Sequence, residues 1–131
     1  MKVTITPAPL QGSITPPPSK SQAHRVIIAA ALASGESLLR NLSPSQDITA
    51  TLGTMEALGA RFQWEGSTVR IQGIRPSGAC GPMDCGESGS TLRFLIPLSL
   101  VLRGGGRFTG RGRLMERPQE PYFRLFEEKH V

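Results

Sequence analysis

The sequence predicts a layered α/β (α+β) fold, with helices packed on a sheet, from three observations. Apolar residues form runs or recur at helical spacing at residues 26–33, 48–58 and 92–102. Short alternating segments lie between these stretches, as expected for half-buried strands. Glycine and proline, 15 and 11 in number, divide the chain where the pattern changes. At 131 residues, the chain has the size of one domain and can bury a real core.

The first half of the chain predicts the order β-α-β-α-β-β. This order favours a compact layered unit over a plain parallel, doubly wound sheet. Ser34-Gly35 is a usual helix stop, and Glu65-Gly66-Ser67 is typical of a hairpin turn. The expected elements are a strand at 3–6, a helix at 21–33, a strand at 36–42, a helix from Ser45 or Asp47 to Gly59, and strands at 61–64 and 68–71.

The second half predicts shorter strands around one strongly apolar helix. Three glycines at 104–106 form a turn after that helix, and Pro118 and Pro121 introduce a final one. The expected elements are a loop at 76–82, a short strand at 83–85, a helix at 92–102, a short strand at 107–109, an arginine-rich loop at 110–118 and a helix at 122–128.

Charge and aromatic content favour small anions as binding partners. The net charge is +5, and arginine greatly outnumbers the three lysines, Lys2, Lys20 and Lys129. The planar guanidinium group suits bidentate contacts with carboxylates and phosphates. Nucleic-acid-binding proteins more often interleave lysines with aromatic residues, which are only 5% of this chain.

The sequence also bears on location and metal content. Residues 94–102 form the best candidate for a membrane span, but Pro97 and Ser99 interrupt them, and no apolar signal-peptide core follows Met1. A cytoplasmic protein is therefore expected. Cys80 and Cys85 have no further cysteine or histidine cluster to complete a zinc site, and a reducing compartment disfavours a disulfide between them. We expect no metal site.

The start of the first helix is a candidate anion site. Pro16-Pro17-Pro18 holds the approach extended, and Ser19 or Ser21 occupies the N-cap position. Lys20 and Arg25 then lie beside free backbone N–H groups and the positive end of the helix dipole, which favour a phosphate or carboxylate. A capped helix with solvated basic residues explains the same stretch.

Two later loops repeat this combination of small donors and basic residues. Residues 86–93 place glycines, hydroxyl groups and Arg93 at the start of the apolar helix, although the spacing is neither that of a P-loop nor that of a dinucleotide fingerprint. Residues 110–117 place Arg111, Arg113 and Arg117 in one loop, where they repel one another unless an anion draws them together. A simple helix cap and a solvated basic loop are the alternatives.

Four motifs follow one another along the chain: Ser19-Lys20-Ser21-x-x-x-Arg25, Asn41-Leu42-Ser43-x-Ser45-x-Asp47, Gly86-Glu87-Ser88-Gly89-Ser90-Thr91-Leu92-Arg93 and Glu116-Arg117-Pro118. In this order they resemble the motifs of the 5-enolpyruvylshikimate-3-phosphate synthase family of enolpyruvyl transferases. The resemblance covers residues 3–129. UDP-N-acetylglucosamine enolpyruvyl transferases are similar in fold, but they carry Asn where this chain has Ser21, and no loop cysteine matches their catalytic one.

The resemblance implies an enzyme of the shikimate pathway, which leads to chorismate and the aromatic amino acids. It implies transfer of the enolpyruvyl group of phosphoenolpyruvate to the 5-hydroxyl of shikimate 3-phosphate, without metal or cofactor. Lys20 and Asp47 are then the catalytic residues, with Lys20 between both substrates. Lys20 also counts among the implied substrate-binding residues. Ser21 and Arg25 would hold shikimate 3-phosphate, and Gly89 and Arg117 would hold phosphoenolpyruvate, with Arg93 nearby.

The chain is much shorter than members of this family, whose two similar domains close over the substrates. We therefore expect an N-terminal piece, a single partial domain at residues 1–131, with helices packed against a mixed sheet. Residues 1–12 are then a strand and linker that pack with the absent domain, and residues 13–131 are most of the first and part of the second folding unit. Glu87 replaces the Asn of some members.

Activity is expected to require the missing C-terminal half, because the strong acid and base carboxylates of the family belong to it. Two alternatives to an inactive enzyme fragment remain. One is a binding module for small anions such as phosphate. The other is a basic nucleic-acid-binding domain, which the low aromatic content disfavours. No membrane partner is expected.

Overall fold

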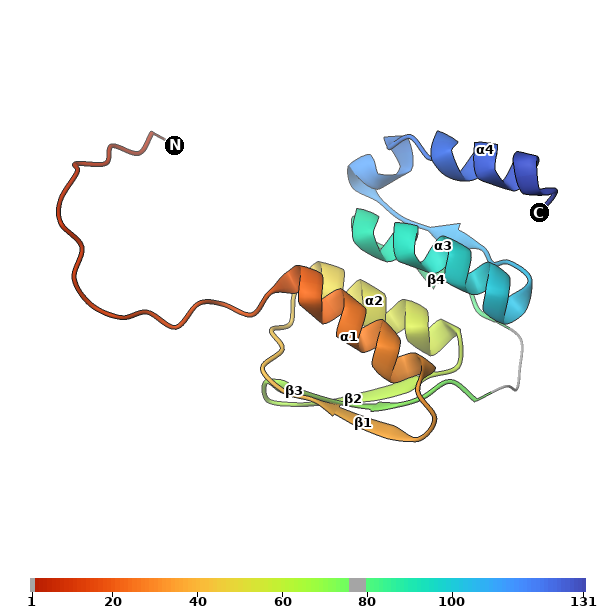
Figure 1. The fold of residues 1–131 in the computed structure, drawn as a ribbon, viewed down its shortest axis with the longest axis horizontal. Helices are drawn as coiled ribbons and strands as arrows, with labels where there is room; N and C mark the ends of the chain where they lie inside the picture. The colour runs from red at the N-terminus through yellow and green to blue at the C-terminus, as the bar shows by residue number, and fades with distance from the viewer. Residues whose placement is uncertain (1, 76–79) are drawn as a thin grey trace.

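A three-stranded antiparallel sheet forms one layer of the structure, and helices cover one of its faces (Figure 1). The computed structural model describes residues 2–75 and 80–131. The sheet has the order β1-β3-β2, and Val69 of β3 pairs with Leu39 on one side and with Trp64 on the other. The strands are β1 (Glu36–Leu39), β2 (Arg61–Glu65) and β3 (Thr68–Gln72). The predicted hairpin is therefore confirmed, with Gly66 at a positive φ of 63° in its turn.

Helices α1 (Lys20–Leu32) and α2 (Gln46–Ala57) lie side by side over this sheet. Each begins at a serine whose side chain accepts a hydrogen bond from the backbone three residues later. Ser19 Oγ lies 3.3 Å from Gln22 N, and Ser45 Oγ lies 3.3 Å from Ile48 N. The sequence left Ser19 or Ser21 open as the first cap and Ser45 or Asp47 as the second. Ser19 and Ser45 are the residues that cap the helices.

The core fills the space between these helices and the sheet and continues beyond the helices to Met83 and Leu95. Alternation along β3 turns Val69 and Ile71 toward the helices, where both are buried. Completely buried aliphatic side chains of this size each contribute about 1.5–3 kcal/mol relative to exposure. The largest side chains of this core are Ile27, Ile48, Leu52, Met55, Leu58, Val69, Ile71, Met83 and Leu95.

Two further strands form a separate small sheet. Strand β4 (Met83–Asp84) pairs in parallel with β5 (Phe108–Thr109), and helix α3 (Gly89–Arg103) connects them. The prediction of one mixed sheet is therefore wrong. Strand β4 packs against α2, and its strand pairing is with β5 and not with an edge of the antiparallel sheet.

The segment after β5 is more regular than predicted. A 3₁₀ helix, η1 (Gly112–Glu116), occupies part of the predicted arginine loop, and α4 (Glu120–Lys129) follows it. Pro97 lies inside α3 and cannot donate to the carbonyl of Arg93 four residues earlier. The Tyr122 hydroxyl donates to that carbonyl at 2.8 Å. The phenol thus satisfies an acceptor left free by the proline and fastens α4 to α3.

The predicted strand at residues 3–6 does not form. Residues 2–19 extend away from the helices as an irregular arm, and Val3 and Ile5 are 66% and 84% exposed (Figure 1). Alternating residues make a strand only when a neighbouring strand accepts their backbone hydrogen bonds. Such a neighbour is missing among the described residues. The alternating residues 3–6 therefore stay as irregular chain without strand pairing.

The described residues test two further predictions only in part, the loop at 76–82 and the absence of a membrane span. The predicted loop at 76–82 lies partly outside the described residues, which omit 76–79. Within the described part of the chain, no helix is both long enough and apolar enough to cross a bilayer.

Candidate functional site

The amino-terminal ends of α1, α2 and α3 lie at the same end of the structure (Figure 1). Each helix presents backbone N–H groups without an intrahelical partner and the positive end of its dipole there. The motifs at residues 19–25 and 86–93 and the start of α2 therefore form one region. The predicted catalytic and substrate-binding residues begin or adjoin these three helices.

Lys20 and Asp47, the two predicted catalytic residues, form an ion pair between α1 and α2. The Lys20 ammonium Nζ lies 2.8 Å from Asp47 Oδ2. Both side chains remain accessible, at 59% and 30% exposure, so solvent weakens their attraction. An ammonium and a carboxylate in direct contact can exchange a proton with a bound molecule as well as neutralise each other.

Arg25 lies one turn further along α1 and is held by its own helix and by α3. Its guanidinium donates to the carbonyl oxygen of Ser21 at 2.7 Å and lies 5.3 Å from the ring centre of Phe94. A guanidinium over an aromatic face is attracted by the ring quadrupole. Ser21 and Arg25 are both exposed at this end of α1, and Phe94 is a contact that the sequence prediction missed.

Gly89 and Arg117 also lie together. A methyl group at Gly89 would approach Arg117 Nη1 to 2.6 Å, so the missing side chain leaves room for the guanidinium. Ser88 caps α3 beside them and accepts a hydrogen bond from Thr91 N at 3.2 Å. The Arg93 side chain is exposed on the first turn of α3. A backbone N–H and a guanidinium in this arrangement can contact the same anion.

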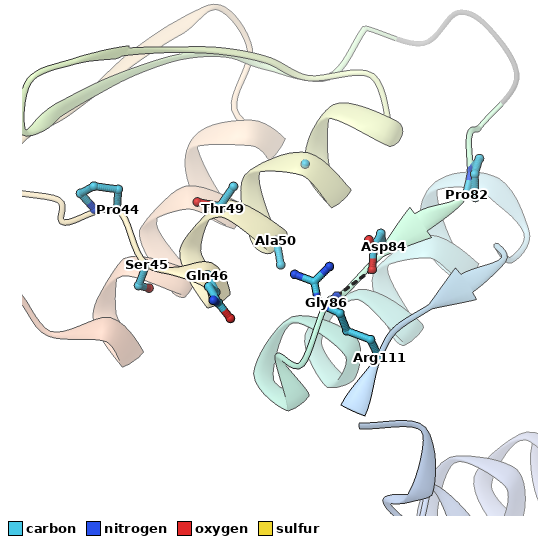
Figure 2. A pocket seen from close by; sticks show the side chains of 10 residues that line it. Pro44, Ser45, Gln46, Thr49, Ala50, Pro82, Asp84, Gly86 and Arg111 are labelled. Atoms are coloured by element: carbon cyan, nitrogen blue, oxygen red, sulfur yellow. Dashed lines mark hydrogen bonds between the residues drawn. The ribbon is translucent and has the colours of Figure 1, made fainter. Parts of the chain in front are cut away.

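The arginine-rich loop divides between two places, contrary to the prediction of a single cluster. Arg117 adjoins Gly89, whereas Arg111 points between α2 and β4, beside Ala50 and Gly86 (Figure 2). There it lines an open cleft of about 580 Å³. The Asp84 carboxylate in the same cleft accepts from Gly86 N at 2.8 Å.

A buried chain of polar side chains connects the three helices behind the candidate site. His24 of α1 contacts Thr51 of α2, which contacts Thr91 of α3, and Thr91 in turn contacts Ser88. The sequence prediction missed all of these contacts. Polar residues on apolar helix faces were the available signal, because a buried polar side chain must find a partner.

Burial lowers the pKa of His24, because the interior disfavours the charged imidazolium. The carboxylate of Asp47 opposes this shift, while the positive charges of Lys20 and Arg25 add to it. His24 is therefore neutral at physiological pH. The thiol of Cys85, also buried, has its pKa raised to about 11 by desolvation and by Asp84, which makes it unreactive.

The free energy of unfolding should fall as the pH drops below 6.5, the ordinary pKa of histidine. The unfolded chain takes up the proton near that value, whereas folded His24 takes it up only at lower pH, so acid favours unfolding. Urea denaturation at about pH 7.5 and about pH 5.5 measures the loss. His24→Asn cannot titrate and should flatten the dependence in this window; an unchanged slope in that variant would assign it to other groups.

The described residues give no metal-binding arrangement. None of their histidine, cysteine, aspartate and glutamate side chains gather in groups of three or more that could hold a metal ion. Cys80 and Cys85 are both free thiols.

Comparison of the sequence with known proteins identifies a family and several relatives. The family described as EPSP synthase (3-phosphoshikimate 1-carboxyvinyltransferase) matches residues 5–130. A relative with the latter name from Clostridium perfringens is 48% identical over 132 residues, which cover 99% of this chain and 31% of the relative. A relative from Clostridium acetobutylicum is 45% identical over 133 residues, with 98% and 31% covered. The chain thus spans less than a third of the length of these curated relatives.

Structural comparison agrees with the sequence matches. EPSP synthase from Acinetobacter baumannii superposes with a TM-score of 0.69 and 25% identity, over 88% of this chain and 27% of that one. The family match extends across nearly all of the sequence and includes every motif at the helix starts. The chain therefore belongs to the EPSP synthase (3-phosphoshikimate 1-carboxyvinyltransferase) family.

Proposed function

We propose that this chain supplies one wall of the active site of an enolpyruvyl transferase. The reaction moves the enolpyruvyl group of phosphoenolpyruvate to the 5-hydroxyl of shikimate 3-phosphate, within the shikimate pathway. The observation that carries the proposal is the gathering of Lys20, Asp47, Gly89 and Arg117 around three helix N-termini in a member of this family. Two anionic substrates repel each other, so fixed cations and N–H groups are needed to hold them together.

In the proposed site, α1 binds shikimate 3-phosphate and α3 binds phosphoenolpyruvate. Ser21 and Arg25 contact shikimate 3-phosphate, and Arg93 and Arg117 contact phosphoenolpyruvate beside the N–H of Gly89. Lys20 lies between the substrates. These roles use the bidentate geometry of arginine for phosphate and carboxylate groups and the helix N-terminus for anions.

The chemistry needs a proton donor and a proton acceptor. The methylene carbon of phosphoenolpyruvate must gain a proton while the 5-hydroxyl loses one and bonds to the carbon that carries the phosphate; the tetrahedral ketal then loses phosphate from that carbon and a proton from the new methyl group, which re-forms the double bond. Lys20 and Asp47, 2.8 Å apart, are a pair that can take part in these proton transfers. We propose that further acid and base groups come from the portion present only in the longer relatives, so that the isolated chain does not turn over.

Titration of the isolated chain with phosphoenolpyruvate and with shikimate 3-phosphate tests the binding roles. Amide NMR shifts should change at Gly89 with the first ligand and at Ser21 and Arg25 with the second. Flat shifts at millimolar ligand would contradict the proposal. Co-expression with the remaining two thirds of the Clostridium perfringens relative then tests catalysis, because activity should appear only when both parts are present.

Gly89→Ala should weaken phosphoenolpyruvate binding about fivefold, since a displaced charged hydrogen bond is worth roughly 1 kcal/mol or more. The new methyl group would meet Arg117 Nη1 at 2.6 Å, and the flexible guanidinium must move away. Gly89 does not require a positive φ, so the fold should tolerate alanine. Phosphoenolpyruvate titration and urea denaturation measure both effects, and unchanged affinity would remove Arg117 from the proposed ligand contacts.

A further inference from the structure

A continuous chain of polar side chains runs through the buried centre of the helices. His24 Nδ1 lies 2.7 Å from Thr51 Oγ1, and Thr51 Oγ1 lies 2.8 Å from Thr91 Oγ1. The Thr91 hydroxyl donates to Ser88 Oγ at 2.7 Å. None of the four residues is more than 2% exposed. This polar network of His24, Thr51, Thr91 and Ser88 thus crosses from α1 through α2 to the cap of α3 without contact with solvent.

This chain constrains the helices more tightly than apolar packing would. A buried hydroxyl left without a partner costs about 1–3 kcal/mol, so separation of the helices at this level is opposed by each broken contact. Apolar side chains can slide by fractions of an ångström at little cost, whereas hydrogen bonds lose strength steeply with distance and angle. A satisfied buried network therefore fixes one relative placement of the elements that it joins.

The two central threonines and the Ser88 end of this network adjoin residues of the candidate site. The hydroxyls of Thr51 and Thr91 lie 3.1 Å and 3.4 Å from the carbonyl oxygen of Asp47, whose side chain holds Lys20. Ser88 also accepts from Thr91 N at 3.2 Å and directly precedes Gly89. Displacement of either threonine hydroxyl would move the start of α2 relative to the start of α3.

We propose that Thr51 and Thr91 are positioning residues of the anion site. Their hydroxyls hold the first turns of α1, α2 and α3 so that Lys20 and Gly89 face the same bound anion. Both threonines are 0% exposed and cannot touch a ligand, so they act only through the residues that they place. The proposal rests on the proposed function for its anion.

Thr54 offers a matched control on the same helix. It is also 0% exposed, but among the described residues its hydroxyl donates only to carbonyls of α2, those of Ala50 at 2.9 Å and Thr51 at 2.8 Å. Replacement by valine removes one buried hydroxyl and keeps the shape in either position. Thr51→Val breaks the link between helices, and Thr54→Val does not.

The first measurement uses the chain without ligand. Thr51→Val should shift the imidazole ¹⁵N signals of His24 and the amide signals of Ser88 and Gly89, whereas Thr54→Val should leave them in place. Thr51→Ser, which keeps the hydroxyl, should restore the original signals. If Thr51→Val does not fold, Thr91→Val breaks the same link from α3. Equal shifts in the Thr51→Val and Thr54→Val variants would overturn the proposal.

The second measurement is a titration with inorganic phosphate, followed at Lys20 and Gly89. Thr51→Val should raise the dissociation constant about fivefold, the equivalent of one hydrogen bond, while Thr54→Val stays within about twofold of the unsubstituted chain. Equal affinities in both valine variants would overturn the positioning role. Absence of phosphate binding in the unsubstituted chain would instead contradict the proposed function, and the ligand-free signals would still decide the role of Thr51.

Discussion

Gly73→Ala is expected to prevent stable folding of the chain. Gly73 directly follows β3 and lies against the carboxyl end of α1, where an added Cβ would overlap the backbone carbonyl of Ala33. The neighbouring backbone cannot simply retreat, because Gly73 N donates to Gly35 O at 2.9 Å and Ile74 N donates to Ala31 O at 2.8 Å. Ala31 is one of the last residues of α1, so the same contacts satisfy its helix terminus.

The cost of this overlap should be at least about 3 kcal/mol, a large part of the roughly 5–15 kcal/mol that stabilises a typical domain. Urea denaturation followed by circular dichroism measures it. Gly53→Ala is the matched control, because Gly53 lies in α2 and an added Cβ there meets nothing within 4 Å. That control should gain about 0.5–1 kcal/mol from helix propensity. Equal midpoints for Gly73→Ala and the unsubstituted chain would contradict the predicted clash.

The helices were predictable because their signals are local. Ser19 and Ser45 cap α1 and α2 at positions that the sequence marks, and the apolar spacing that follows each one is read within a single helix. The hairpin at Gly66 is equally local. The strand predicted at residues 3–6 was wrong, since its formation depends on a partner strand and not on its own alternation.

The candidate site was predictable only as separate motifs. The sequence places Lys20 and Gly89 beside predicted helix starts, but it does not state that Asp47 lies 2.8 Å from Lys20 or that Arg117 adjoins Gly89. The buried polar network joins His24 to Thr51, 27 positions later, and Thr51 to Thr91, 40 positions later. No periodicity in the sequence encodes contacts over such separations. Its distances follow from the packing of whole helices.

The separation of Arg111 from Arg117 shows the same limit for charge. Three arginines within seven residues suggest one anion site when only sequence distance is considered. The short 3₁₀ helix η1 intervenes, so Arg111 points toward α2 while Arg117 reaches the start of α3. Separation of the guanidinium groups reduces their repulsion without any bound anion.

Lys20→Ala is expected to weaken phosphoenolpyruvate binding by the isolated chain about tenfold, the effect of losing one charged hydrogen bond. The substitution has a second consequence, because it leaves the Asp47 carboxylate unneutralised at the anion site. The Asp47 side chain is 30% exposed, so its carboxylate stays hydrated at the same position and repels the ligand. Amide shifts at Gly89 during a phosphoenolpyruvate titration measure the loss.

Asp47→Asn should act in the opposite direction and tighten phosphoenolpyruvate binding about twofold, since an exposed ion pair competes weakly for the lysine. It removes a negative charge and releases the Lys20 ammonium, now paired at 2.8 Å, for the ligand. In the co-expressed assembly the same substitution should lower turnover, because the proposed role of Asp47 is in proton transfer and not in binding. Weaker binding in Asp47→Asn would make the carboxylate a ligand-positioning group, and unchanged turnover would remove it from the chemistry.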